Sequence, residues 1–125
     1  MRVEHFLGVD EINDENEIKN VLSKRVNDQV NEFWIGMQEE LYPCLCVSVN
    51  GENAHVQYFE KAGEPGIQAI GNDNSGEMCI FYTNTPTEKI EIEKQFVITI
   101  NQAIDIVEFF YRTKELTNEV QWYEL

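Results

Sequence analysis

Basic residues are scarce in this chain of 125 residues. It contains 9 Lys and Arg against 23 Asp and Glu, which gives a formal net charge of −14. Proteins that bind nucleic acid or an anionic membrane surface directly need a basic face. We therefore expect neither nucleic acid nor a membrane as a direct partner of the chain.

Long apolar runs, secretion signals and paired cysteines are also lacking. The uninterrupted hydrophobic segments are too short to span a bilayer, and residues 1–6 lack the features of a secretory signal. The cysteines number three, and Cys44 and Cys46 stand one residue apart, which does not indicate a disulfide framework. These absences predict a cytoplasmic protein with free thiols.

What is present is sufficient for one folded unit. Hydrophobic residues make up 42% of the chain and aromatic residues 11%, enough for a hydrophobic core. No internal repeat or linker is visible, so a single domain over residues 1–125 is expected.

The negative charge is concentrated in the middle of the chain. Residues 26–88 contain ten Asp and Glu but Lys61 as the only base, a balance of −9 in 63 residues. Acids without neighbouring bases project a continuous negative potential. A surface that serves solubility alone usually mixes both signs. An acidic binding surface and a merely soluble surface both remain open.

Two segments have the periodicity of helices. In residues 14–30 the apolar positions repeat with a period near 3.6, and Asp14 is placed to cap the first turn. Residues 101–114 form a second amphipathic stripe, with Asn101 as the predicted N-cap.

An Asn50-Gly51 pair between two strand-like segments predicts a β-hairpin of residues 43–49 and 53–59. With these two residues as the turn, Val49 lies opposite Glu52 and Val47 opposite Ala54. One hairpin face is then apolar (Leu45, Val47, Val49, Ala54, Val56, Tyr58), and the other is mostly polar (Cys44, Cys46, Ser48, Asn53, His55, Gln57, Phe59).

Further strands are expected at residues 33–38, 66–70, 78–82, 89–93, 96–100 and 120–124, and residues 1–7 are expected as an edge strand. Residues 60–76 contain many glycines and are interpreted as loop-rich. The fold class predicted is α+β, a mostly antiparallel sheet with two main helices.

Catalytic and metal-binding motifs are weak. Cys44, Cys46 and His55 share a predicted face, but alternating cysteines on a strand provide a poor zinc site with no evident fourth ligand. A Cys46–His55 pair, possible as cross-strand neighbours, lacks a third group to orient the imidazole. The segment Pro43-Cys44-Leu45-Cys46 is one residue shorter than the deaminase P-C-x-x-C motif, and no H-x-E precedes it. The sequence predicts no catalytic residues, no metal and no cofactor.

Several short segments of the chain have a distinctive order and spacing: Tyr58-Phe59, Gly63-Glu64-Pro65-Gly66-Ile67-Gln68, Phe81-Tyr82-Thr83-Asn84, Glu88, Ala103-Ile104, Phe109-Phe110, Glu115-Leu116 and Val120-Gln121-Trp122-Tyr123-Glu124-Leu125. In these segments the chain resembles an immunity-protein family of bacterial polymorphic toxin systems, the first catalogued among them (Imm family one), often encoded beside nucleic-acid deaminase toxins. The resemblance covers about residues 43–125.

The resemblance implies a small cytoplasmic antitoxin of contact-dependent bacterial competition. It would bind a cognate toxin's C-terminal domain, a basic nuclease or deaminase, and occlude its active-site cleft. The family pattern supplies no catalytic residues. Trp122 is expected to anchor the core rather than touch the partner.

The predicted partner-binding residues are the acids of the loop-rich stretch: Glu60, Glu64, Asp73 and Glu77. Complementary charge accelerates association, while affinity depends on a few buried contacts, expected to be aromatic. Two alternatives remain: an acidic intracellular adaptor or regulator, and a small enzyme that uses Cys46 and His55.

Overall fold

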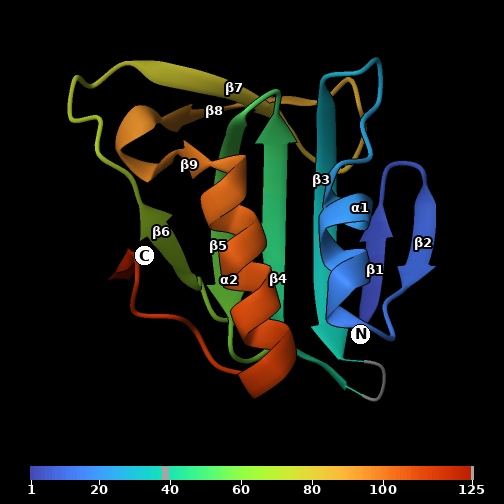
Figure 1. Cartoon of the computed structure of the whole chain (residues 1–125). Coiled ribbons are helices and arrows are strands. Elements are labelled where there is room, and N and C mark those ends of the chain that lie inside the picture. Colours follow the sequence, from blue (N-terminus) through green and yellow to red (C-terminus); the bar gives the residue numbers. More distant parts are fainter. Residues whose placement is uncertain (38–39, 125) are drawn as a thin grey trace.

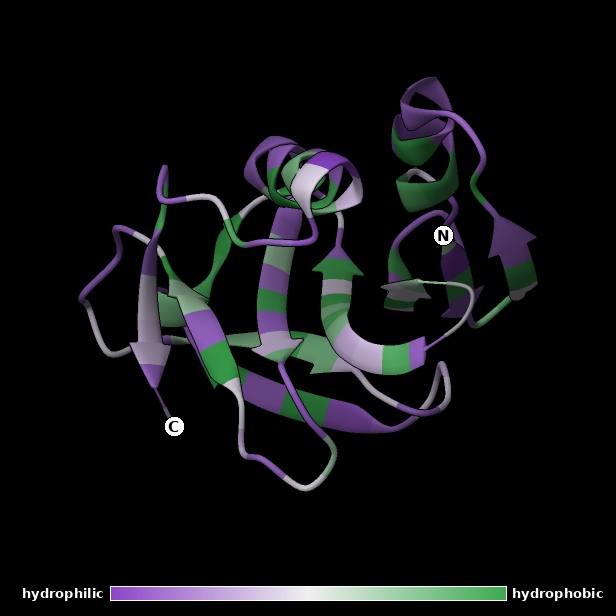
Figure 2. Ribbon diagram, turned by 90° about the horizontal axis from the view of Figure 1, so that it is seen from below, coloured by the Kyte–Doolittle hydropathy of each residue, from purple (hydrophilic) through white to green (hydrophobic). Residues whose placement is uncertain are grey.

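The computed structural model describes residues 1–37 and 40–124. An eight-stranded sheet carries two helices on one face and a two-stranded ribbon on the other (Figures 1 and 2). The main strands lie in the order β10-β6-β5-β4-β3-β1-β2, with β9 also pairing with β5, and every pairing is antiparallel. The α+β fold class predicted from the sequence is confirmed.

The elements follow one another along the chain with these bounds. The first half contains β1 (Arg2–His5), β2 (Gly8–Glu11), η1 (Glu15–Glu17), α1 (Ile18–Leu22), β3 (Val30–Met37), β4 (Glu40–Asn50) and β5 (Asn53–Phe59). The second half contains β6 (Ile67–Ile70), β7 (Met78–Tyr82), β8 (Lys89–Glu93), η2 (Lys94–Phe96), β9 (Ile98–Thr99), α2 (Ile100–Thr113) and β10 (Gln121–Glu124).

The central hairpin β4–β5 has the predicted faces but not the predicted register. Asn50 pairs with Asn53 and Val49 with Ala54, so the turn is formed by Gly51 and Glu52 rather than by Asn50 and Gly51. Gly51 has a φ of +60°, and the first central position of a type II′ turn favours glycine for this reason. A shift of two residues leaves each side chain on its predicted face, because the side-chain period is two.

The N-cap of helix α2 lies two residues before the predicted one. Its N-cap is Thr99, not Asn101: the Thr99 hydroxyl accepts from the Gln102 backbone N–H at 3.1 Å. The Gln102 side chain accepts from the Thr99 N–H at 3.0 Å in return, which completes a capping box. Within the described residues, no helix has both the length and the apolar character that a membrane crossing requires.

The first predicted helix is much shorter than residues 14–30. Asp14 caps η1 by accepting from the Asn16 N–H at 2.8 Å, as expected, but α1 ends at Leu22. Asn27 and Asp28 both have positive φ and form a turn that leads into β3. Asn and Asp tolerate this conformation better than other non-glycine residues. Val26 lies between the end of α1 and this turn, where it pairs with Val30, so it is not part of the helix.

The N-terminal segment and residues 96–100 also differ from the predictions. Residues 1–7 were expected as an edge strand, but β1 pairs with β3 on one side and with β2 on the other, so β2 is the edge. Of residues 96–100, only Ile98–Thr99 form a strand. Phe96 belongs to η2, Val97 to neither helix nor strand, and Ile100 to α2. The strands Met78–Tyr82 and Lys89–Glu93 have the predicted bounds. Gln38, Glu39 and Leu125, which also belong to sequence predictions, lie outside the described residues.

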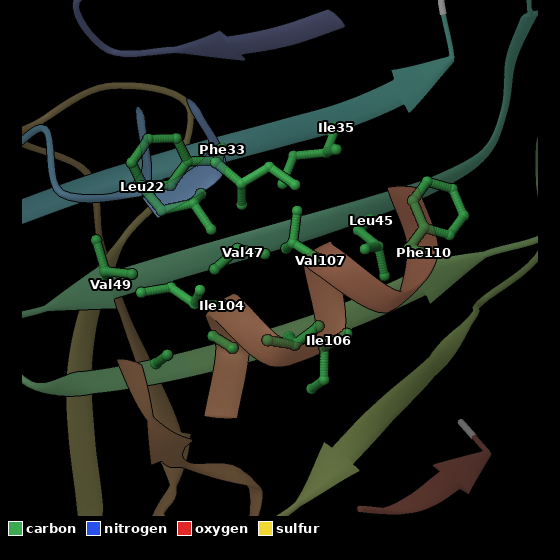
Figure 3. Packing of buried hydrophobic residues seen from close by; sticks show 14 of the residues in the cluster. Leu22, Phe33, Ile35, Leu45, Val47, Val49, Ile104, Ile106, Val107 and Phe110 are labelled. Carbon is green, nitrogen blue, oxygen red and sulfur yellow. The ribbon is translucent and has the colours of Figure 1, made fainter. Parts of the chain in front are cut away.

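The hydrophobic core fills the space between the sheet and α1 and α2 (Figure 3). The apolar face of the β4–β5 hairpin lies against α2, with Leu45, Val47 and Val56 fully buried. Phe33 and Ile35 extend this face onto β3, where Leu22 of α1 covers it. Trp122 packs against the edge of this cluster, and its indole N–H donates to the Thr117 carbonyl at 3.0 Å. The helices thus use one face of the sheet, which leaves the opposite face to the ribbon and to solvent.

Candidate binding surface

One end of the outer sheet face is covered by the β7–β8 ribbon, which lies below the sheet in Figure 2. Phe81 of β7 is fully buried there, and its ring centroid is 6.2 Å from that of His55 on β5. The Asn50 side chain donates a hydrogen bond to the Ile80 carbonyl at 2.9 Å. The mostly polar face that the sequence predicted for the hairpin is therefore partly internal.

Cys46 and His55 share this face, as predicted, but they are not cross-strand neighbours. Cys46 lies opposite Gln57, and His55 lies opposite Ser48. The sequence-based pairing is wrong because of the two-residue shift in register. His55 Nε2 instead forms a hydrogen bond of 2.7 Å with Gln68 Oε1.

The protonation states of these groups do not suit a nucleophile. Burial raises the pKa of the Cys46 thiol well above its ordinary value, and the negative charge of Glu32 raises it further. Burial also lowers the pKa of His55. A neutral thiol without an adjacent base is a poor nucleophile. Among the described residues, no group of three or more His, Cys, Asp or Glu side chains is placed to hold a metal ion.

The other end of the outer face is uncovered and aromatic. Trp34 of β3 is 40% exposed, and its ring stacks on Phe59 of β5 with centroids 5.9 Å apart and planes at 25°. The two rings belong to strands on either side of β4, whose Cys44 and Cys46 lie between them in the register and are buried. Leu41, near the start of β4, is 81% exposed. We call Trp34, Phe59 and Leu41 the aromatic surface.

Glu32 lies next to the aromatic surface, on the same face of β3, and is only 4% exposed. Its Oε1 accepts from the Trp34 indole N–H at 3.1 Å and from the Asn84 backbone N–H at 3.1 Å. Both donors are neutral. In the described part of the chain, no Lys, Arg or His lies within ion-pair distance of this carboxylate.

Two grooves meet at Trp34. One has a volume of about 370 Å³ and is lined by Glu4, His5, Phe6, Glu32, Trp34, Asn84, Thr85 and Pro86. The other has a volume of about 180 Å³ and is lined largely by apolar atoms, with Trp34, Met37 and Leu41 among its residues. The buried carboxylate of Glu32 thus reaches the wall of an open groove.

The four acids predicted from the sequence are all exposed, but they form two pairs rather than one group. Glu60 and Glu64 precede β6, whereas Asp73 and Glu77 follow it, so β6 separates the pairs (Figure 1). Glu60 and Glu64 line a shallow hollow of about 290 Å³ together with Glu124.

The second pair of acids is partly neutralised. Glu77 Oε2 accepts from Lys94 Nζ at 3.0 Å. Hydrogen bonds from Ser75 lower the pKa of Asp73, and the nearby Lys94 lowers it slightly further. The acids of the first pair have no Lys or Arg within ion-pair distance among the described residues. The first pair therefore carries more of the uncompensated charge.

The loop of the first pair packs against the aromatic surface. Gly66 has a φ of +79°, and a Cβ at this position would lie 2.8 Å from the Phe59 ring. Only glycine allows this approach without displacement. The loop that carries Glu60 and Glu64 is thereby held beside Phe59.

Sequence reasoning did not identify Trp34 and Glu32. The available signal was alternation: Phe33 and Ile35 point into the core, so their neighbours point to the outer face. A tryptophan on an outward-facing strand position is a candidate contact residue. That the β7–β8 ribbon stops short of Trp34 could be learned only from the structure.

Comparison with known proteins gives one clear result. The chain is 28% identical over 125 residues, spanning the whole of both proteins, to the double-stranded DNA deaminase immunity protein of Burkholderia cenocepacia (strain H111). No protein-family profile matches the chain. Along its full length, therefore, this chain is similar to a protein whose function is immunity to a deaminase.

Proposed function

We propose that this protein is an immunity protein, an antitoxin that binds and neutralises a cognate toxin domain. The observation that carries the proposal is the full-length similarity to a deaminase immunity protein. The net charge of −14 supports it, because enzymes that act on nucleic acid present basic clefts that an acidic protein complements.

The partner we infer is the C-terminal domain of a deaminase toxin, blocked at its basic active-site cleft. Occlusion requires only that the antitoxin occupy the path of the nucleic acid, so the protein needs no catalytic residue, metal or cofactor. The cytoplasm is its proposed location, since the toxin's target lies there. We also propose that it belongs to Imm family one, within polymorphic toxin systems of contact-dependent inhibition.

The acidic loops are proposed to guide the first encounter. Glu60 and Glu64 are exposed and lack a cation partner among the described residues, so their charges remain available to a basic partner. Asp73 and Glu77 contribute at the other end of β6, with Lys94 offsetting part of their charge. Complementary fields of this kind raise association rates most strongly at low salt.

Co-expression tests this function. The proposed cognate deaminase domain is expressed in bacteria with and without this chain, and growth and co-purification are scored. We expect restored growth and a stable complex in the presence of the chain. Continued growth arrest without a complex, at matched expression of the chain, would overturn the proposal.

A further inference from the structure

We propose that the toxin domain docks on the aromatic surface, with Trp34 at the centre of the interface. The Glu32 carboxylate then forms an ion pair with a Lys or Arg side chain of the toxin. This inference rests on the proposed function and adds to it the place and chemistry of the contact.

The first reason is the incomplete covering of the outer face. The β7–β8 ribbon buries Phe81 over one end of this face, but leaves Trp34 40% exposed at the other. Trp34 is held by a ring stack with Phe59 and a hydrogen bond to Glu32, so its orientation is fixed before binding. A preorganised, half-exposed tryptophan beside a groove has the properties of an interface hot spot, because little side-chain entropy is lost on binding.

The second reason is the unneutralised charge of Glu32. A carboxylate removed from water is costly unless it is paired, and here the two donors to Oε1 are neutral. The side chain lines the groove that also contains Glu4 and Trp34. A cationic side chain that enters this groove would meet the carboxylate of Glu32 and the indole of Trp34. Arg and Lys interact favourably with both groups.

The negative charge of this surface also favours a basic partner over a second copy of this chain. Among the described residues that line the two grooves, the basic side chains are Arg2 and His5. The Arg2 guanidinium already pairs with Glu4 at 2.7 Å, and His5 Nε2 lies 2.8 Å from Asp10 Oδ2. Two copies would bring Glu32, Glu40 and their counterparts together in a protein of net charge −14, which is unfavourable. A basic partner removes this repulsion and supplies the missing cation.

The test measures binding of a catalytically inactive form of the proposed cognate deaminase domain to variants of the whole chain. Glu32→Gln keeps the shape and the acceptor oxygen but removes the charge. Trp34→Ala removes the aromatic side chain at the centre of the proposed interface. Trp34→Phe keeps an aromatic ring there and serves as the second variant in case Trp34→Ala fails to fold. Controls are Glu91→Gln on the exposed side of β8 and Tyr123→Ala. Tyr123 is half exposed on the outer face. It belongs to the same cross-strand row as Trp34, which runs from Trp34 on β3 through Cys46, Gln57 and Gln68 to Tyr123 on β10.

We expect Kd to rise about 30-fold or more for Trp34→Ala and about tenfold or more for Glu32→Gln, with little change for the controls. The thermal midpoint of free Glu32→Gln should stay the same or rise, because a buried charge is removed. That combination separates a binding role from a purely structural one.

Two results would overturn the inference. One is wild-type affinity for Glu32→Gln and for both Trp34 variants while the wild-type chain still neutralises the toxin, in which case the proposed function stands without this interface. The other is a wild-type dimer in light scattering that Trp34→Ala dissociates, which would make the surface a contact between copies. Failure of the wild-type chain to bind at all would count against the proposed function instead.

Discussion

The indole N–H of Trp34 donates a hydrogen bond of 3.1 Å to Oε1 of Glu32, two residues earlier on the same strand. This bond joins an exposed aromatic ring to a buried carboxylate within one row of side chains on the outer sheet face. The apolar contact and the ionic contact that we infer for the toxin therefore originate from adjacent, mutually positioned groups.

Charge reversal of the acidic loops should affect the rate of association. Replacement of Glu60 and Glu64 by Lys should slow association with the toxin domain and flatten its dependence on salt between about 50 and 500 mM. The fold should persist, because both side chains are exposed. Stopped-flow or surface-based kinetics, with circular dichroism as the folding control, measure this effect.

The same reversal at Asp73 and Glu77 should have a smaller effect. Lys94 pairs with Glu77 and lies near Asp73, so these acids present less net charge to a partner. Association rates of the two double variants, compared in one buffer, test this order. If neither reversal nor salt changes the rate, the negative charge serves solubility rather than capture.

Removal of the thiol and imidazole groups should leave neutralisation largely intact. Combined replacement of Cys44, Cys46 and His55 by Ala removes every group of the hypothetical Cys–His site. It should still destabilise the fold, because Cys46 is 2% and His55 3% exposed and because Gln68 loses its partner, a cost of about 1–3 kcal/mol for that group alone. Denaturant unfolding and toxin inhibition by the folded fraction provide the two measurements. A well-folded triple variant that no longer inhibits the toxin would restore the alternative of an active Cys–His site.

The buried imidazole should make stability depend on pH. The pKa of His55 is lowered in the folded protein by burial, so below about 6.5 the unfolded chain binds a proton that the folded chain resists. The contribution of neutral His55 is thus complete above this pH and is lost as the pH falls through the lowered value. The free energy of unfolding, measured from pH 7.5 to 5, should fall more steeply for the wild-type chain than for His55→Gln. Parallel profiles would contradict this assignment of the pH dependence.

The capping box predicts a contrast between two neighbouring residues. Thr99→Ala should destabilise the protein by about 1 kcal/mol, because the first turn of α2 loses its cap. Asn101→Ala, one residue inside the helix, should be neutral or slightly stabilising, because alanine has the higher helix propensity. Thermal unfolding of both variants measures the contrast, and an equal loss at the two positions would speak against Thr99 as the cap.

Alternation and short-range motifs account for what the sequence predicted correctly. The apolar and polar faces of β4–β5 followed from their period of two, which survives a register shift of two residues. The register itself was missed because a two-residue turn can be formed either by Asn50-Gly51 or by Gly51-Glu52. The choice between these two turns depends on strand pairing in the whole sheet. The length of α1 was overestimated because Val26 continued the helical stripe, while the turn at Asn27 and Asp28 depends on local backbone conformation.

The candidate site was predictable only in part. The acidity of the loop with Glu60 and Glu64 was evident in the sequence, and the structure places this loop beside Phe59. Trp34 and Glu32 become recognisable once the β7–β8 ribbon is seen to cover His55 and to leave Trp34 exposed. The packing of the β7–β8 ribbon on the main sheet depends on contacts between residues far apart in the chain, which local patterns do not encode.

The most direct measurement of the central claim is a titration of the proposed cognate deaminase domain with the purified chain while deamination of its nucleic-acid substrate is followed. Neutralisation by tight binding predicts that activity falls linearly to the background level at a defined molar ratio, and that added substrate does not restore it at low excess. Full activity in the presence of a large excess of folded chain would contradict the account.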